Sequence, residues 1–154
     1  MLDPQTNWEP YILFELADST YGIPAHLVQQ MEMLERITPV PNAPLFLEGV
    51  VFSRGKMIPA VNLRVKFGLD KIAYNLRSRL IVVNIANRSI GLIVDSAREF
   101  VNIPHDALKP PPEGISELSA KYLSGIALWE NRVILVLNLP EIVNVNGRSL
   151  VEMG

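Results

Sequence analysis

An internal repeat constrains the fold of this chain more than any other feature of its sequence. Residues 13–23 match residues 82–92, 69 positions later, in the order of their apolar, turn and glycine positions. Residues 46–50 match residues 122–126, 76 positions later, in the same way. Any two β-hairpins share part of such a pattern, but the common order and the matched glycines favour duplication of one unit. The larger second offset predicts a longer loop in the second half.

The duplicated unit is a pair of β-hairpins joined by a link. In the first copy, Gly49–Phe67 contains two apolar runs around the polar residues 53–56, and Gly55 suits the positive φ of a tight turn. A lone hairpin cannot bury its apolar face, so each hairpin must belong to a larger sheet or barrel. The sequence therefore predicts an all-β protein with short helices, built as two packed antiparallel barrels of about five strands each.

The repeat also sets the expected domain organisation. Its halves are expected at about 11–67 and 80–143, with a polar, basic linker at about 68–79. A half of about 65 residues buries too little surface to be stable alone, so we expect the two barrels to pack together. All of this falls within one predicted domain that spans residues 8–146.

Three short segments that flank the hairpins have their own predicted local structure. Residues 26–34 fit either a helical face or a strand, and the residues alone leave both possibilities open. A turn of helix is expected at 45–47, before the Gly49 hairpin. A short helix is expected from Pro140 to Val145, because proline suits the first turn of a helix.

The composition excludes several classes of protein. The chain is 49% hydrophobic and 19% charged, which is typical of a globular protein. It has no cysteine, which excludes disulfides and thiolate chemistry. The N-terminus lacks the pattern of a signal peptide, and no apolar run approaches the roughly 18 residues of a membrane span. We therefore expect a cytoplasmic protein without direct membrane insertion.

The residue types that carry catalysis do not form a recognisable site. His26 and His105 lack a second ligand at metal-binding spacing, so no metal or cofactor is expected. Ser53 does not fit the nucleophile motif G-x-S-x-G, because position 51 is Val where that motif requires Gly. Asp95 follows an apolar run and is expected at a strand end or turn. The sequence thus predicts a binding protein and not an enzyme.

Nucleic-acid binding is the alternative from another functional class. Residues 54–79 are basic, and small β-barrels with a basic groove and exposed aromatic side chains bind single strands. The aromatic side chains Phe14, Phe52 and Phe67, however, occupy positions expected to face the core or a hairpin. The net charge of −2 also gives no general attraction to phosphate, so the sequence predicts no nucleic-acid partner.

Protein docking fits the remaining pattern better. Two packed barrels create a groove at their junction, and exposed sheet edges accept strands or helices. Val28, Met31, Met33 and Ile37 lie near the polar residues 29–30, a mixture that suits a helix-binding groove. The same apolar residues fit a protein core equally well.

A set of ordered motifs resembles the chemotaxis coupling protein family, CheW. Together they cover about residues 10–145 and form a specific combination, although each motif alone is weak. They are Tyr21-Gly22-Ile23-Pro24, Val28-Gln29-Gln30, Pro41-Asn42-Ala43-Pro44, Phe46-Leu47-Glu48-Gly49-Val50, Ser53-Arg54-Gly55, Ile58-Pro59-Ala60-Val61-Asn62-Leu63-Arg64, Lys66-Phe67, Gly91-Leu92-Ile93-Val94-Asp95 and Tyr122-Leu123-Ser124-Gly125.

The resemblance implies a fold and a function. The fold is a pair of intertwined five-stranded SH3-like β-barrels, and the function is that of an adaptor without cofactor or reaction. Its implied partners are the helical tips of methyl-accepting chemoreceptors and the regulatory domain of the histidine kinase CheA. The implied partner-binding positions are Val28, Gln30, Ile37, Gly49, Arg54, Gly55, Leu80, Phe100, Lys109 and Gly125.

The sequence departs from the family pattern at one implied docking position. Where the family usually has Asn-Leu-Arg-Gly, this chain has Phe52-Ser53-Arg54-Gly55, and Asn62 replaces the usual Asp before Leu63. The Arg and Gly are retained, so the implied docking role is retained as well. The departure leaves open which pathway the protein serves: flagellar chemotaxis or a chemotaxis-like pathway such as pilus motility.

Overall fold

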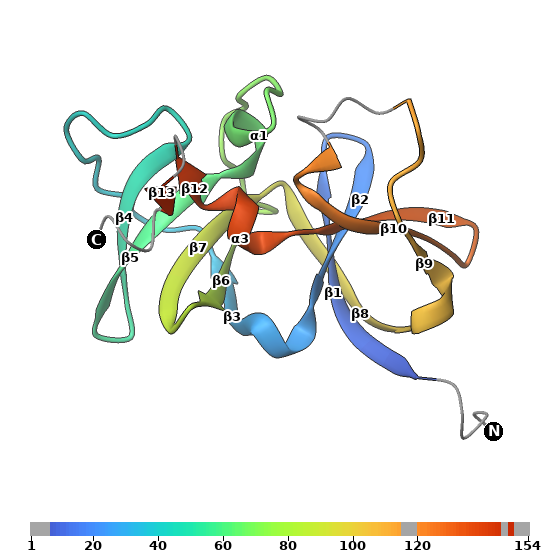
Figure 1. Cartoon of the computed structure of the whole chain (residues 1–154). Helices are drawn as coiled ribbons and strands as arrows, with labels where there is room; N and C mark the ends of the chain where they lie inside the picture. The colour runs from blue at the N-terminus through green and yellow to red at the C-terminus, as the bar shows by residue number, and fades with distance from the viewer. Residues whose placement is uncertain (1–6, 115–119, 146–147, 150–154) are drawn as a thin grey trace.

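The computed structural model describes residues 7–114, 120–145 and 148–149, and most of them lie in short strands (Figure 1). In chain order the elements are β1 (Trp8–Leu16), β2 (Ser19–Pro24), η1 (Ala25–Leu27), β3 (Val28–Met33), β4 (Leu47–Ser53), β5 (Lys56–Asn62), α1 (Leu63–Lys66), β6 (Arg79–Ile85), β7 (Arg88–Val94), β8 (Ser96–Pro104), η2 (His105–Ala107), β9 (Leu108–Lys109), β10 (Leu123–Trp129), β11 (Arg132–Leu137), α3 (Leu139–Ile142), β12 (Asn144–Val145) and β13 (Arg148–Ser149).

The strands form two main sheets that curl into small barrels, and β12 with β13 forms a separate hairpin. Barrel A has the strand order β8-β1-β2-β11-β10-β9, and barrel B has the order β3-β6-β7-β5-β4. The prediction of two packed barrels with short helices is confirmed, with the two-residue β9 as a sixth strand in barrel A. The prediction of purely antiparallel barrels is wrong, because β11 runs parallel to β2 and β5 runs parallel to β7.

The register of the strands follows the sequence repeat. In β1–β2, Leu13 lies opposite Gly22, and in β6–β7 the matched residues Val82 and Gly91 lie opposite each other. The other two hairpins, β4–β5 and β10–β11, have their register irregularity at the same place, next to the matched glycine. Matched strands therefore occupy equivalent places in the two barrels.

The barrels do not coincide with the halves of the repeat. Barrel B comes from the continuous segment 28–94, whereas barrel A combines β1–β2 with strands from the segment 96–137. The repeat halves and the barrels are therefore different divisions of the chain. Each barrel takes hairpins from both halves, because the parallel pairs β2–β11 and β5–β7 join strands that are distant in sequence. This exchange is the intertwining that the family resemblance implies.

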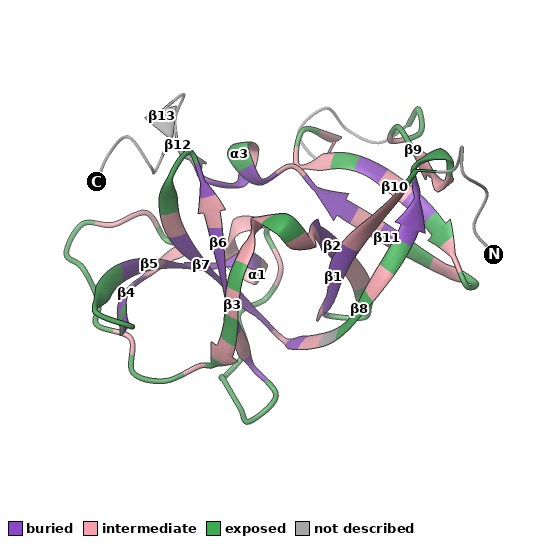
Figure 2. Cartoon of the chain, turned by 90° about the horizontal axis from the view of Figure 1, so that it is seen from below, coloured by how far each residue is buried: buried purple, intermediate pink, exposed green. Residues whose placement is uncertain are grey.

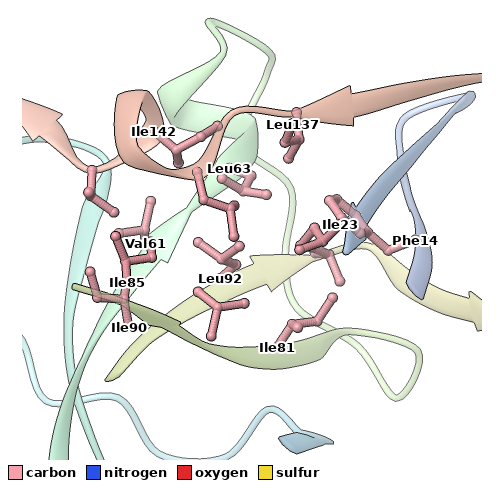
Figure 3. Close-up of a cluster of buried hydrophobic side chains, with 14 of the residues drawn as sticks. Phe14, Ile23, Val61, Leu63, Ile81, Ile85, Ile90, Leu92, Leu137 and Ile142 are labelled. Carbon is pink, nitrogen blue, oxygen red and sulfur yellow. The ribbon is translucent and has the colours of Figure 1, made fainter. Parts of the chain in front are cut away.

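Three hydrophobic clusters follow from this arrangement. One cluster fills barrel A and includes Leu13 and Ile134, and another fills barrel B and includes Leu80 and Val82. The largest cluster lies between the barrels and draws side chains from β1, β2, β5, β6, β7, β11, α1 and α3 (Figure 3). The central strands are therefore buried on both faces (Figure 2). A shared core of this kind makes the two barrels one folding unit.

The structure also tests the predictions for the three short segments 26–34, 45–47 and 140–145. Residues 26–34 contain the end of η1 followed by strand β3, so the strand alternative is the correct one. The helical turn expected at 45–47 is wrong: these residues lead into β4 through a turn in which the Leu47 N–H donates to the Pro44 carbonyl at 2.9 Å. Helix α3 contains Pro140 in its first turn but ends at Ile142, earlier than expected.

Candidate protein-docking site

Side-chain hydrogen bonds join the two edge strands of barrel B, β3 and β4. The Gln30 amide donates to Ser53 Oγ at 2.8 Å and to Glu32 Oε2 at 2.8 Å. The Ser53 hydroxyl donates to Glu32 Oε2 at 3.0 Å, and Ser53 is buried. Buried polar groups must find partners inside the protein, so this triad is a structural contact. It brings Gln30 next to the β4–β5 turn.

The β4–β5 turn presents two cations to solvent. Arg54 and Gly55 have φ values of 49° and 78°, the consecutive positive angles that suit a tight two-residue hairpin turn. The Arg54 and Lys56 side chains are exposed and have no hydrogen-bond or ion-pair partner in the part of the chain that the structure describes. Both charges are therefore available to a carboxylate on another protein.

An exposed apolar pair lies beside these cations. Phe52 on β4 and Met57 on β5 are directly opposite in the sheet, and their exposed fractions are 69% and 60%. Large apolar side chains close to cations at a surface are typical of protein-binding patches. We name the set Phe52, Arg54, Lys56 and Met57 the hairpin surface. On nearby β3, Met31 and Met33 are also exposed, and the strand alternates regularly between exposed and half-buried residues (Figure 2).

Six of the residues implied by the resemblance belong to barrel B or pack against it, and Gly55 in the β4–β5 turn is one of them. Gln30 and Arg54 are linked through the Ser53 contact described above. Val28 is half-buried against the cluster between the barrels, and Ile37 is half-buried against the core of barrel B. Gly49 is buried, because a Cβ atom there would overlap the Thr38 backbone. These residues stay predicted contacts, with Gly49 acting through the backbone and not as a contact surface.

The remaining implied residues are distributed over both barrels. Leu80 is only 1% exposed and lies in the core of barrel B, so its predicted partner-facing position is wrong for the folded chain. Its place in an apolar run on a central strand explains the burial. Phe100 is 60% exposed on β8 and Lys109 is exposed on β9, on the opposite side of the molecule from β4–β5 (Figure 1). Gly125 is buried beside Leu108 and Lys109.

Sequence reasoning missed the apolar part of the hairpin surface. The sequence predicts a core-facing or hairpin position for Phe52 and places Met57 in an apolar run without indicating which way its side chain points. The alternation of a strand provides the missing signal: Val51 and Ser53 point inward, so Phe52 between them must point outward. The register then places Met57 on the same outer face.

A charged clamp holds α1 to the chain segment between β7 and β8. Arg64 donates from Nε to Asp95 Oδ1 at 2.8 Å and from Nη2 to Oδ2 at 2.7 Å. The Ala17 N–H also donates to Oδ2, at 2.8 Å. Burial opposes ionisation of Asp95, but these hydrogen bonds outweigh it and hold the pKa of its carboxyl group below the usual value. Asp95 therefore has the turn position that the sequence predicts, with a structural contact to Arg64.

Among the described residues there is no group of three or more His, Asp or Glu side chains placed to hold a metal ion. The described part of the chain also contains no helix that is long and apolar enough to cross a membrane.

Comparison with known proteins gives consistent results. Residues 10–146 match the family model of the CheW-like domain. The chain is 27% identical to the chemotaxis protein CheW of Klebsiella aerogenes, over 96% of this chain and 89% of that protein. It is 30% identical to chemotaxis protein CheW of Helicobacter pylori, over 86% of this chain and 80% of that protein. The crystal structure of the scaffolding protein TtCheW from Thermoanaerobacter tengcongensis has a TM-score of 0.86 and 32% identity, covering 92% of this chain and 96% of that chain.

Proposed function

The chain belongs to the CheW-like domain family of chemotaxis coupling proteins, and from this premise we propose that it is a non-enzymatic adaptor. The proposed adaptor joins the helical tips of chemoreceptors to the regulatory domain of a CheA-type histidine kinase. The observation that carries the proposal is the hairpin surface, where an exposed apolar pair lies beside two cations that have no partner among the described residues. A surface of this kind can bind a partner protein without catalysing a reaction.

The kinase contact is assigned to the hairpin surface. The turn is rigid because Arg54 and Gly55 have the backbone angles of a tight hairpin and Ser53 is bonded to β3. A preorganised surface loses little conformational entropy on binding, which favours a specific interface. An acidic, partly apolar face on the regulatory domain would match it. The departure of this chain from the family pattern, at Phe52 and Ser53, falls on the same hairpin, so partner choice is also assigned here.

The receptor contact is assigned to Phe100 and Val28. Phe100 lies opposite Ile12 of β1 and is 60% exposed, whereas Val28 follows η1, which also packs against β1. Phe100 is therefore paired with β1, and Val28 directly follows an element that contacts β1. A helical receptor tip would place an apolar stripe across Phe100 and Val28, in the way that amphipathic helices occupy apolar grooves.

The decisive experiment is a titration of the chain with an isolated CheA regulatory domain by isothermal calorimetry. Arg54→Asp should weaken the complex about tenfold or more, because it places like charges in the interface. Arg88→Asp is the matched control, since Arg88 is an exposed arginine at the start of β7 beside another hairpin turn. No complex with the unchanged chain at tens of micromolar would contradict the proposal.

Two further measurements distinguish the receptor contact from the kinase contact and test whether each variant folds. Phe100→Ala should weaken binding to a receptor-tip fragment and leave kinase binding unchanged. Thermal unfolding of each variant provides the folding control, because substitution of a solvated side chain should change stability by no more than roughly ±0.5 kcal/mol. If Arg54→Asp unfolds the chain, Arg54 is structural and its assignment to the interface is wrong.

A further inference from the structure

Every methionine in the part of the chain that the structure describes is exposed. Met31 and Met33 on β3 have exposed fractions of 45% and 52%, and Met57 on β5 has an exposed fraction of 60%. Methionine is usually a core residue, because its flexible thioether fills irregular gaps between packed side chains. Among the described residues, however, the three hydrophobic clusters contain no methionine and consist mainly of isoleucine, leucine and valine. Core packing therefore does not explain these methionines.

Met57 differs from the other two methionines in its position, because it belongs to the hairpin surface. It lies opposite Phe52 in the β4–β5 ladder and directly follows the exposed Lys56. Met31 and Met33 lie outside the hairpin surface, on the strand that side-chain hydrogen bonds join to β4. The protein thus has one methionine within the proposed kinase contact and two of similar exposure on a neighbouring strand.

The thioether of methionine is the only sulfur group in this protein, because the chain has no cysteine. An exposed thioether reacts with hydrogen peroxide to give methionine sulfoxide. The sulfur lone pair attacks one peroxide oxygen and the O–O bond breaks, and the departing hydroxide takes the proton of the attacked oxygen and leaves as water. The sulfur is oxidised by two electrons and the peroxide is reduced by two. The product is polar, and methionine sulfoxide reductases convert it back to methionine.

We propose that Met57 is a site of reversible oxidation by peroxide, and that its sulfoxide weakens docking at the hairpin surface. The effect on docking rests on the proposed function, whereas the modification itself does not. A sulfoxide oxygen accepts hydrogen bonds, so a partner that covers it must supply a donor or leave the oxygen unsatisfied. A partner face that fits the apolar pair Phe52 and Met57 has no donor at this point, and docking therefore loses affinity. Because a docked partner covers Met57, the reaction occurs on the free chain before assembly.

The test compares the unchanged chain, Met57→Leu and the double variant Met31→Leu/Met33→Leu before and after treatment with hydrogen peroxide. Calorimetry measures the binding of each protein to an isolated CheA regulatory domain. Treatment should weaken binding of the unchanged chain and of the double variant about fivefold or more, because both contain Met57. Met57→Leu should keep the affinity of its own untreated form, since leucine has a similar volume and no sulfur. The two epimer-specific methionine sulfoxide reductases, with dithiothreitol as reductant, should restore the affinity of the unchanged chain.

Two measurements on the protein alone test the modification without a partner. Peptide mass spectrometry follows the oxygen added at each methionine. Met57 should gain oxygen in the folded chain at a rate within about threefold of its rate in concentrated urea, because its side chain is already exposed. The midpoint of thermal unfolding should be the same before and after treatment, because Met57 lies outside the three hydrophobic clusters.

Several outcomes would overturn the proposal. Strong protection of Met57 by folding would show that peroxide does not reach its sulfur. Unchanged binding after complete oxidation of Met57, or an equal loss of binding in Met57→Leu, would show that its sulfoxide does not control docking. A lower unfolding midpoint after treatment would attribute the loss of binding to damage of the fold. If the untreated chain does not bind the regulatory domain, the proposed function is wrong and the effect on docking fails with it, while the oxidation rates still decide whether Met57 is a modification site.

Discussion

The hairpins β4–β5 and β10–β11 have nearly the same backbone and different surfaces. Each turns through two residues with positive φ, Arg54-Gly55 in one and Glu130-Asn131 in the other. Each presents an exposed apolar pair one residue pair away from the turn. The exposed fractions agree closely: 69% and 60% for Phe52 and Met57, 67% and 57% for Leu128 and Val133. Duplication has therefore preserved both the turn and the apolar pair.

The charges at the two turns differ. Arg54 and Lys56 have no partner among the described residues, whereas Arg132 on β11 forms ion pairs with Glu99 of β8 and with Glu130 of its own turn. The β10–β11 turn is therefore neutralised within barrel A, and the β4–β5 turn keeps its charge for another molecule. We therefore expect the two turns to differ as docking surfaces although their apolar exposure is equal, because only the β4–β5 turn has charges without a partner among the described residues.

The largest expected difference between the hairpins concerns their matched glycines. Gly49 has a φ of 149° and no space for a Cβ beside the Thr38 backbone, so Gly49→Ala should cost roughly 3 kcal/mol or more. At Gly125 a Cβ would lie 2.8 Å from the Lys109 carbonyl oxygen, without a positive φ, so Gly125→Ala should cost only about 1–3 kcal/mol. Urea unfolding of both variants measures the two costs, and equal costs would show that backbone strain at Gly49 is unimportant.

The second difference lies in the short helices that follow the hairpins. Arg64 in α1 holds Asp95, whereas the matched position in α3 is Pro140, which cannot form such a clamp. Arg64→Gln should cost roughly 2 kcal/mol of unfolding free energy near neutral pH, because it removes two charge-assisted hydrogen bonds. Lys71→Gln should cost at most about 1 kcal/mol, because its ion pair with Glu48 is more exposed.

The pH dependence of stability tests the same clamp. The folded chain lowers the pKa of Asp95 below its unfolded value, so the clamp stabilises the protein fully above that unfolded value of about 3.9. This contribution is lost as pH falls below the unfolded value and through the lower folded pKa. Unfolding measured between pH 6 and pH 3 should therefore show a smaller decrease in Arg64→Gln than in the unchanged chain. Parallel curves would exclude Arg64 as the cause of the Asp95 shift.

The third difference concerns the residue just before each turn. Ser53 joins β4 to β3 through hydrogen bonds, whereas the matched Trp129 packs edge-to-face on Trp8 with ring centroids 5.5 Å apart. Ser53→Ala should cost about 1 kcal/mol, since Gln30 and Glu32 still bond to each other. Thermal unfolding measures this cost. A cost near zero would mean that β3 is held to β4 by other contacts.

The sequence predicts strands, turns and matched glycines well because local alternation and turn residues determine them. It does not predict how the barrels share strands, because the parallel pairs β2–β11 and β5–β7 join segments with no common local signal. The same limit applies to the candidate site. Arg54 at a hairpin turn is predictable from its neighbours, but the burial of Leu80 depends on which strands cover β6. The Arg64–Asp95 contact likewise joins α1 to the segment between β7 and β8, which no local sequence pattern pairs.

The smallest expected effect on stability gives the sharpest test of the comparison. Phe52→Ser and Leu128→Ser each remove an exposed side chain from an equivalent position, so each should change the free energy of unfolding by no more than roughly 0.5 kcal/mol. Their effects on binding to a CheA regulatory domain should differ: calorimetry should show weaker binding for Phe52→Ser and unchanged binding for Leu128→Ser. Equal losses would mean that both apolar pairs dock on the kinase. In that case the free charge of Arg54 and Lys56 would not be what selects one hairpin over the other.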